Sequence, residues 1–83
     1  MKVTVRYFAS IREALGQGSE TVQARGETVG QLRDELIARG GAYSAALARG
    51  KAVRMALDQV MCDEAAVLRD GAEVAFFPPV TGG

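Results

Sequence analysis

Apolar and polar residues alternate in several stretches of the 83-residue chain, which is typical of half-buried β-strands. In residues 2–8, one phase holds Val3, Val5 and Tyr7, and the other holds Thr4, Arg6 and Phe8. Residues 19–24 predict a return strand, and residues 52–62 predict a strand that turns near Asp58 and Gln59 into a short partner. An Asp-Gly turn at 70 and 71 then precedes a strand in which Val74 and Phe76 oppose Ala75 and Phe77.

Helical patterns lie between these predicted strands. Ser10 and Glu13 have capping-box spacing and Gly16 is a natural stop, so this segment predicts one or two helical turns. The main helix should begin at Thr28, with Gln31 completing a capping box, and should end at Gly40 and Gly41. Its apolar stripe comprises Val29, Leu32, Leu36 and Ile37. Residues 42–50 predict a minor helix or a loop in which Tyr43 and Leu47 share a face.

This order of elements predicts an α+β fold, with a mixed sheet and one main helix packed across one of its faces. The chain is long enough for one domain and too short for two separate cores. Pro78 and Pro79 should end the last strand because they lack amide donors. We therefore expect a domain over residues 1–77 and an extended tail over residues 78–83.

Composition narrows the possible functions. Ten basic residues balance ten acidic ones without forming a block, so we expect no binding to nucleic acid or to a membrane. The absence of a long apolar segment makes a cytoplasmic protein the expectation. The chain has no histidine, so it lacks the usual general base and the usual zinc ligands, and no metal is expected. The lone Cys62 is interpreted as a small packing residue.

The ending, FFPPVTGG, suggests a chemical role. At about 3.3 Å per residue, the six residues after Phe77 could reach roughly 20 Å from the sheet. Gly82 and Gly83 would fit a channel too narrow for larger residues, and the reactive group at the tip would be the α-carboxylate of Gly83. Adenylation of this carboxylate would create a leaving group that a sulfur donor could replace, giving a thiocarboxylate. ATP and Mg²⁺ would belong to the activating partner, so no cofactor need bind to the chain itself.

Two segments carry a resemblance to a known family. DGAEVAFFPPVTGG resembles the carboxyl end of the small, sulfur-carrying subunits of molybdopterin synthase, and VRYFASIREALG resembles their opening strand and helix. The similarity spans nearly the whole chain, although residues 25–52 match only in pattern. Where that family often has Asn-Gln after the third strand, this chain has Asp58-Gln59, a change that does not touch the tail.

The resemblance implies a ubiquitin-like β-grasp fold and a non-catalytic role as a sulfur donor. It implies that an ATP-dependent activating enzyme adenylates Gly83 and that a sulfurtransferase system supplies the sulfur. The tail would then enter the large subunit of molybdopterin synthase, where sulfur passes to cyclic pyranopterin monophosphate. Two small and two large subunits would form a heterotetramer.

The uncovered side of the sheet is a candidate partner surface. If Val3, Val5, Tyr7, Val74 and Phe76 face the helix, then Phe8 and Phe77 point the other way, and Met61 could join them. Arg6 and Arg54 would lie at the rim of this surface. The expected partner contacts are Phe8, Met61, Phe77, Pro78, Pro79, Val80 and Thr81. The alternative is that the aromatic residues only complete the core.

Three other functions stay open at this point. A sulfur carrier of thiamine biosynthesis also ends in Gly-Gly, but such proteins are usually shorter and lack the FFPPV approach. A ubiquitin-like modifier would join Gly83 to a lysine of a target protein. A plain interaction domain would have an inert tail, and removing Gly83 would then leave its function intact.

Overall fold

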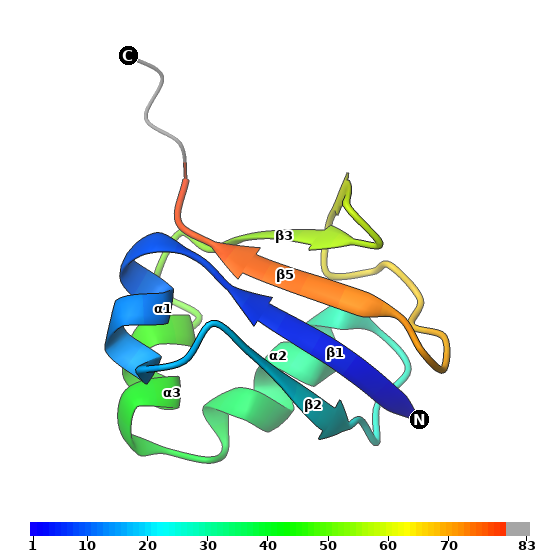
Figure 1. Cartoon of the computed structure of the whole chain (residues 1–83), viewed down its shortest axis with the longest axis horizontal. Coiled ribbons are helices and arrows are strands. Elements are labelled where there is room, and N and C mark those ends of the chain that lie inside the picture. Colours follow the sequence, from blue (N-terminus) through cyan, green and yellow to red (C-terminus); the bar gives the residue numbers. More distant parts are fainter. Residues whose placement is uncertain (80–83) are drawn as a thin grey trace.

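The computed structural model describes residues 1–79, which form a five-stranded mixed sheet with three helices (Figure 1). The strands are β1 (Lys2–Tyr7), β2 (Ser19–Gln23), β3 (Arg54–Leu57), β4 (Val60–Cys62) and β5 (Glu73–Phe77). The helices are α1 (Ala9–Leu15), α2 (Val29–Ile37) and α3 (Gly41–Leu47). The predicted α+β fold is confirmed, and the segment left open as a minor helix or a loop is a helix.

The strands lie in the order β2-β1-β5-β3-β4, so β5 occupies the middle of the sheet. β1 and β5 are parallel, and the other neighbouring pairs are antiparallel. The turn between β3 and β4 is formed by Asp58 and Gln59, which have φ of 49° and 68°. Two successive residues of positive φ match the right-handed twist of a hairpin, so the predicted turn is confirmed. As the middle strand, β5 leads Pro78 and Pro79 out of the centre of the sheet (Figure 1).

Helix α2 begins as the sequence predicts. The Thr28 hydroxyl accepts a hydrogen bond from the Gln31 amide at 3.2 Å, and the Gln31 side chain accepts one from the Thr28 amide at 3.2 Å. The predicted end at Gly40 is wrong, because the helix stops at Ile37. The amide of Gly40 instead donates to the carbonyl of Ile37, which tightens the final turn.

Helix α1 has a different start from the predicted one. It begins at Ala9, so Ser10 lies inside the first turn and does not cap it. The amides of Ile11 and Arg12 bond to the carbonyl of Phe8, which stands at the capping position without a side-chain hydrogen bond. The predicted capping box of Ser10 and Glu13 is therefore wrong. The predicted stop at Gly16 is confirmed, because this glycine has φ of 73° and its amide donates to Arg12.

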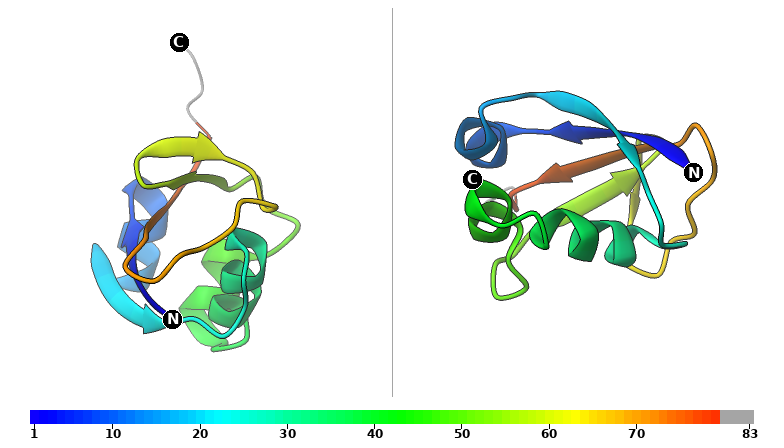
Figure 2. Two further views of the ribbon diagram at one scale, coloured as in Figure 1. Left: turned by 90° about the vertical axis from the view of Figure 1, so that its right-hand side faces the viewer. Right: turned by 90° about the horizontal axis from the view of Figure 1, so that it is seen from below.

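The core lies between the sheet and α2, which crosses one face, while α1 and α3 lie together where β1 and β5 end (Figures 1 and 2). Its largest fully buried side chains include those predicted to face the helix: Val3, Val5, Tyr7, Val74 and Phe76. From α2 they meet Val29, Leu32 and Leu36, whereas Ile37 is only partly buried. Apolar burial on one face therefore fixes which phase of each strand points inward.

A buried arginine holds the segment that follows α3. Arg33 of α2 is 4% exposed, and its guanidinium donates to the carbonyl oxygens of Leu47 and Ala48 at 2.8 and 2.7 Å. It also donates to the carbonyl of Lys51 at 3.3 Å. Burial, and secondarily the nearby charge of Arg49, lower the pKa of Arg33. These bonds satisfy carbonyls at the end of α3 and lead the chain into β3.

Candidate functional site: an open sheet face beside the tail

The face of the sheet turned away from the helices is defined by the strand register. Residues directly opposite each other on paired strands project to the same side. Met61 is opposite Ala56, and Ala56 is opposite Ala75, which in turn neighbours Arg6. Phe77 is opposite Arg54. We call the surface formed by Arg6, Phe8, Arg54, Ala56, Met61, Ala75 and Phe77 the open face.

Large apolar side chains lie in solvent on this open face. Met61 is 55% exposed and Phe8 is 40% exposed, while Phe77 is half-buried. Ala56 lies between them and is 8% exposed, although it is outside the main core cluster. The predicted phase of all three large residues therefore agrees with the register. The face combines aromatic, methionine and arginine side chains, the residue types enriched in protein interfaces. That it binds a partner stays a prediction.

Arg6 and Phe8 form one unit at the end of β1. The guanidinium carbon of Arg6 lies 5.5 Å from the centre of the Phe8 ring, which is a cation–π geometry. Arg6 also approaches Glu73 at 3.9 Å. The Phe8 amide donates to the carbonyl of Phe76 at 3.2 Å, so Phe8 continues the parallel pairing to the end of β5. This bond brings the Phe8 backbone to the point where β5 gives way to Pro78.

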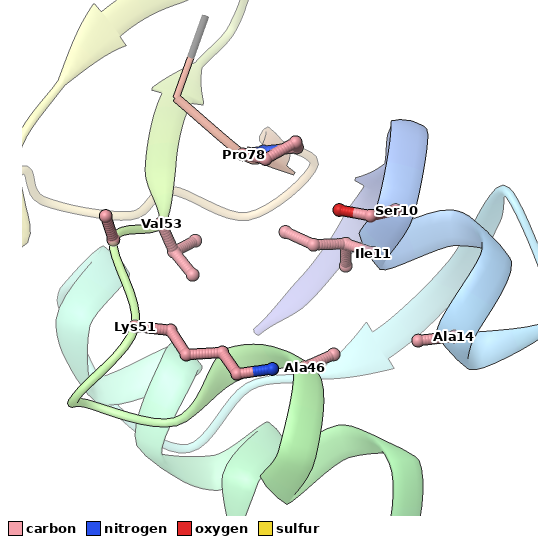
Figure 3. A pocket seen from close by; sticks show the side chains of 8 residues that line it. Ser10, Ile11, Ala14, Ala46, Lys51, Val53 and Pro78 are labelled. Carbon is pink, nitrogen blue, oxygen red and sulfur yellow. The ribbon is translucent and has the colours of Figure 1, made fainter. Parts of the chain in front are cut away.

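The base of the tail starts directly from this face. β5 ends at Phe77, and Pro78 is half-buried while Pro79 is exposed. Pro78 also lines a small hollow on the side of α1 and α3 (Figure 3). The remaining predicted site residues, Val80, Thr81, Gly82 and Gly83, lie outside the described residues.

Cys62 is not part of this open face. It pairs with Met55, which points into the core, and it is half-buried itself. Burial, with a smaller contribution from Asp63, raises the pKa of its thiol. A thiol that is harder to ionise is a poorer nucleophile, which agrees with its interpretation as a packing residue.

A polar cluster around Glu20 lies on the helix side of the sheet, and sequence patterns gave no sign of it. Its carboxylate accepts hydrogen bonds from the hydroxyls of Tyr7 and Tyr43 at 2.8 and 2.6 Å. It also accepts from Gln17 at 3.0 Å and from Arg39 at 2.8 Å. Burial alone would raise the pKa of Glu20, but the bonds from Arg39, Tyr43 and Tyr7 lower it overall. Burial first, and then Glu20, raise the pKa of Tyr7. The cluster joins β1, β2 and the helices and is structural.

Together, the mixed sheet, the crossing helix and the central last strand define a ubiquitin-like β-grasp protein. The crystal structure of SAMP1 from Haloferax volcanii is similar to this chain with a TM-score of 0.79 and 25% identity, covering 100% of both chains. One chain in the complex of subunits 1 and 2 of the molybdopterin-converting factor from Helicobacter pylori is also similar to this chain. It has a TM-score of 0.69 and 25% identity, again over 100% of both chains. The fold expected from the resemblance is confirmed.

Within this class, the chain belongs to the ThiS family, whose model matches residues 5–83. The chain is also 41% identical over 81 residues to the molybdopterin synthase sulfur carrier subunit of Escherichia coli K12. That alignment covers 98% of this chain and 99% of the relative. The family resemblance seen in the two terminal segments thus extends over nearly the full length. Within residues 1–79, no helix has the length and apolar character needed to cross a bilayer.

Proposed function

We propose that this protein is the sulfur-carrier subunit of a molybdopterin synthase and that Gly83 carries the sulfur as a thiocarboxylate. The observation that carries the proposal is the family match through residue 83, which includes the Thr-Gly-Gly segment. The 41% identity to the E. coli sulfur carrier over 98% of the chain favours this member of the family over a thiamine-pathway carrier. The folded domain then serves to present the tail.

The chemistry starts at the α-carboxylate of Gly83. One carboxylate oxygen attacks the α-phosphorus of ATP, pyrophosphate leaves, and an acyl adenylate forms. Sulfide supplied by the donor system then attacks the carbonyl carbon, the carbon–oxygen bond to the phosphate breaks, and AMP leaves with that oxygen and the bonding electron pair. The product is a thiocarboxylate, which transfers its sulfur to cyclic pyranopterin monophosphate in the large subunit. The activating enzyme binds ATP and Mg²⁺, and the chain acts as a co-substrate.

The open face and the tail base have complementary roles in this proposal. Phe8, Met61 and Phe77 form the apolar centre of the docking surface, with Arg6 and Arg54 at its rim. Because Phe77 joins this surface to Pro78, docking of the face aims the tail at the partner's active site. The large subunit and the activating enzyme would use the face at different times. The Helicobacter pylori complex of subunits 1 and 2 supports the first of these partners.

Deletion of Gly83 tests the proposal. The deletion should abolish molybdopterin formation in a reconstituted reaction with the large subunit, the activating enzyme and the sulfur donor. The urea unfolding midpoint should not change, because the core lies within residues 1–79. A Val67→Ala chain, altered at an exposed position outside the open face, is the control and should stay active. Full activity of the deleted chain would refute the proposal.

A protein modifier is the second candidate. The fold similarity to SAMP1 of Haloferax volcanii favours this function, because a second crystal structure of the H. volcanii protein describes SAMP1 as small archaeal modifier protein 1. In that case Gly83 would form an isopeptide bond with a lysine of a target protein. Mass spectrometry of digested cell protein would then find a remnant of this tail on lysine side chains, whereas a dedicated sulfur carrier leaves none.

A further inference from the structure

A small apolar hollow adjoins the base of the tail on the side opposite the open face. It has a volume of about 130 Å³ and is lined mainly by Ile11, Ala14, Ala46, Lys51, Val53 and Pro78. In Figure 3, Ile11 and Val53 project into the space between α1 and the segment before β3, and Pro78 borders it. The hollow is of a size to receive one apolar side chain and is too small for a cofactor.

The walls of the hollow are held by buried contacts. On one side, α1 packs against α3 and fixes the positions of Ile11 and Ala14. On the other side, the Arg33 guanidinium binds the carbonyls of Leu47, Ala48 and Lys51 at 2.8, 2.7 and 3.3 Å. Because Arg33 is 4% exposed, these bonds are shielded from water. The hollow is therefore formed before any partner binds.

Lys51 gives the hollow a charge. Its side chain is exposed and runs along the lower border of the hollow, with the amino group beside Ala46 (Figure 3). Among residues 1–79, no carboxylate lies within 4.0 Å of this amino group. An apolar recess with an available ammonium group at its border is complementary to an apolar side chain that has a carboxylate next to it.

Resting on the proposed function, we propose that the hollow receives an apolar side chain of the large subunit of molybdopterin synthase, and that an adjacent carboxylate of that subunit pairs with Lys51. Pro78 belongs both to the hollow and to the tail. A protein that encloses the tail from its base therefore covers the hollow as well as Phe77. The tail would be held from two sides, which limits the directions in which it can point.

Two substitutions test this contact without disturbing the core. Ala14 is exposed, so Ala14→Phe fills the hollow from its border, and Lys51→Glu reverses the charge. Each change should weaken binding of the full chain to the purified large subunit about tenfold in a calorimetric titration. The matched controls are Ala42→Phe on the exposed part of α3 and Lys2→Glu at the far end of β1, and both should bind like the unaltered chain. Urea unfolding checks that all four variants are folded.

Unchanged affinity of Ala14→Phe and Lys51→Glu would overturn the inference. Weaker binding to the activating enzyme alone, with normal binding to the large subunit, would also overturn the assigned occupant. The proposed function is tested separately, by whether the unaltered chain gains sulfur at Gly83. Variants that bind the large subunit normally refute only the hollow contact, whereas failure of the unaltered chain to gain sulfur refutes the sulfur-carrier function.

Discussion

Two polar residues, the half-buried Glu20 and the buried Arg33, hold the elements of this small domain together. The Glu20 carboxylate joins Tyr7, Tyr43 and Arg39 through hydrogen bonds of 2.6–2.8 Å. Glu20→Gln removes the charge and replaces one acceptor oxygen by a donor. We expect a loss of about 1–3 kcal/mol in the free energy of unfolding at neutral pH, measured by urea denaturation. Glu13→Gln, on the exposed face of α1, is the control and should change little.

The same carboxylate predicts a pH dependence. Its folded-state pKa is below the ordinary value of 4.5, so its contribution to stability is present above that value. The contribution is lost as the pH falls through the folded-state pKa. Urea unfolding at several acidic pH values should therefore show a weaker decline for Glu20→Gln than for the unaltered chain. Parallel declines of the two chains would contradict the assigned role of Glu20.

Arg33 is the second such residue. Arg33→Ala leaves the carbonyls of Leu47 and Ala48 without their donor and opens space beside α2. We expect the free energy of unfolding to fall by about 2–4 kcal/mol. Arg25→Ala, at an exposed position, is the matched control. An equal and small effect of both substitutions in urea denaturation would show that the buried guanidinium does not hold this segment.

At the level of elements, the start of α2 was predictable because both halves of its capping box are local. Thr28→Ala removes the hydroxyl that accepts from the Gln31 amide, and should cost about 1 kcal/mol. Thr28→Ser keeps the hydroxyl and should recover most of this loss. Thermal or urea unfolding compares the midpoints of the two variants. Equal midpoints would show that the Thr28 hydroxyl does not stabilise the start of α2.

The exposed apolar side chains of the open face predict that their removal weakens partner binding without unfolding the domain. Phe8→Ser and Met61→Ser remove apolar surface that is already 40% and 55% exposed, so stability should change little. Binding to the large subunit should weaken at least about tenfold for each, which calorimetry can measure. Val67→Ser is the matched control, because Val67 is 64% exposed but lies outside the open face. Loss of folding in both test variants would instead assign these residues to the core.

Sequence patterns predicted the elements whose signals are local or periodic. Strand alternation placed Phe8, Met61 and Phe77 on one face, because a period of two repeats along each strand. The start of α1 was missed because the Phe8 carbonyl accepts hydrogen bonds from the Ile11 and Arg12 amides, so Phe8 and not Ser10 takes the capping position. Glu20 and Arg33 were missed because their hydrogen-bond partners, apart from Gln17, lie 13 or more positions away and carry no periodic signal. The hollow was missed for the same reason, since residues of α1, of α3, of the segment before β3 and at the base of the tail form it.

On the scale of the whole molecule, the domain places the end of its last strand between two candidate partner surfaces, the open face and the hollow. β5 is the middle strand, so Pro78 emerges between the open face and the hollow rather than at an edge of the sheet. Under the proposed function, the domain presents the tail, and other proteins process its reactive group.

Intact-mass measurement of the purified chain tests the central claim most directly. The chain is incubated with ATP, Mg²⁺, sulfide and an activating enzyme that is already proven on the E. coli carrier. The account predicts a mass increase equal to the difference between one sulfur and one oxygen atom, located at Gly83 and absent from a chain that lacks this residue. An unchanged mass with that active enzyme would contradict the account.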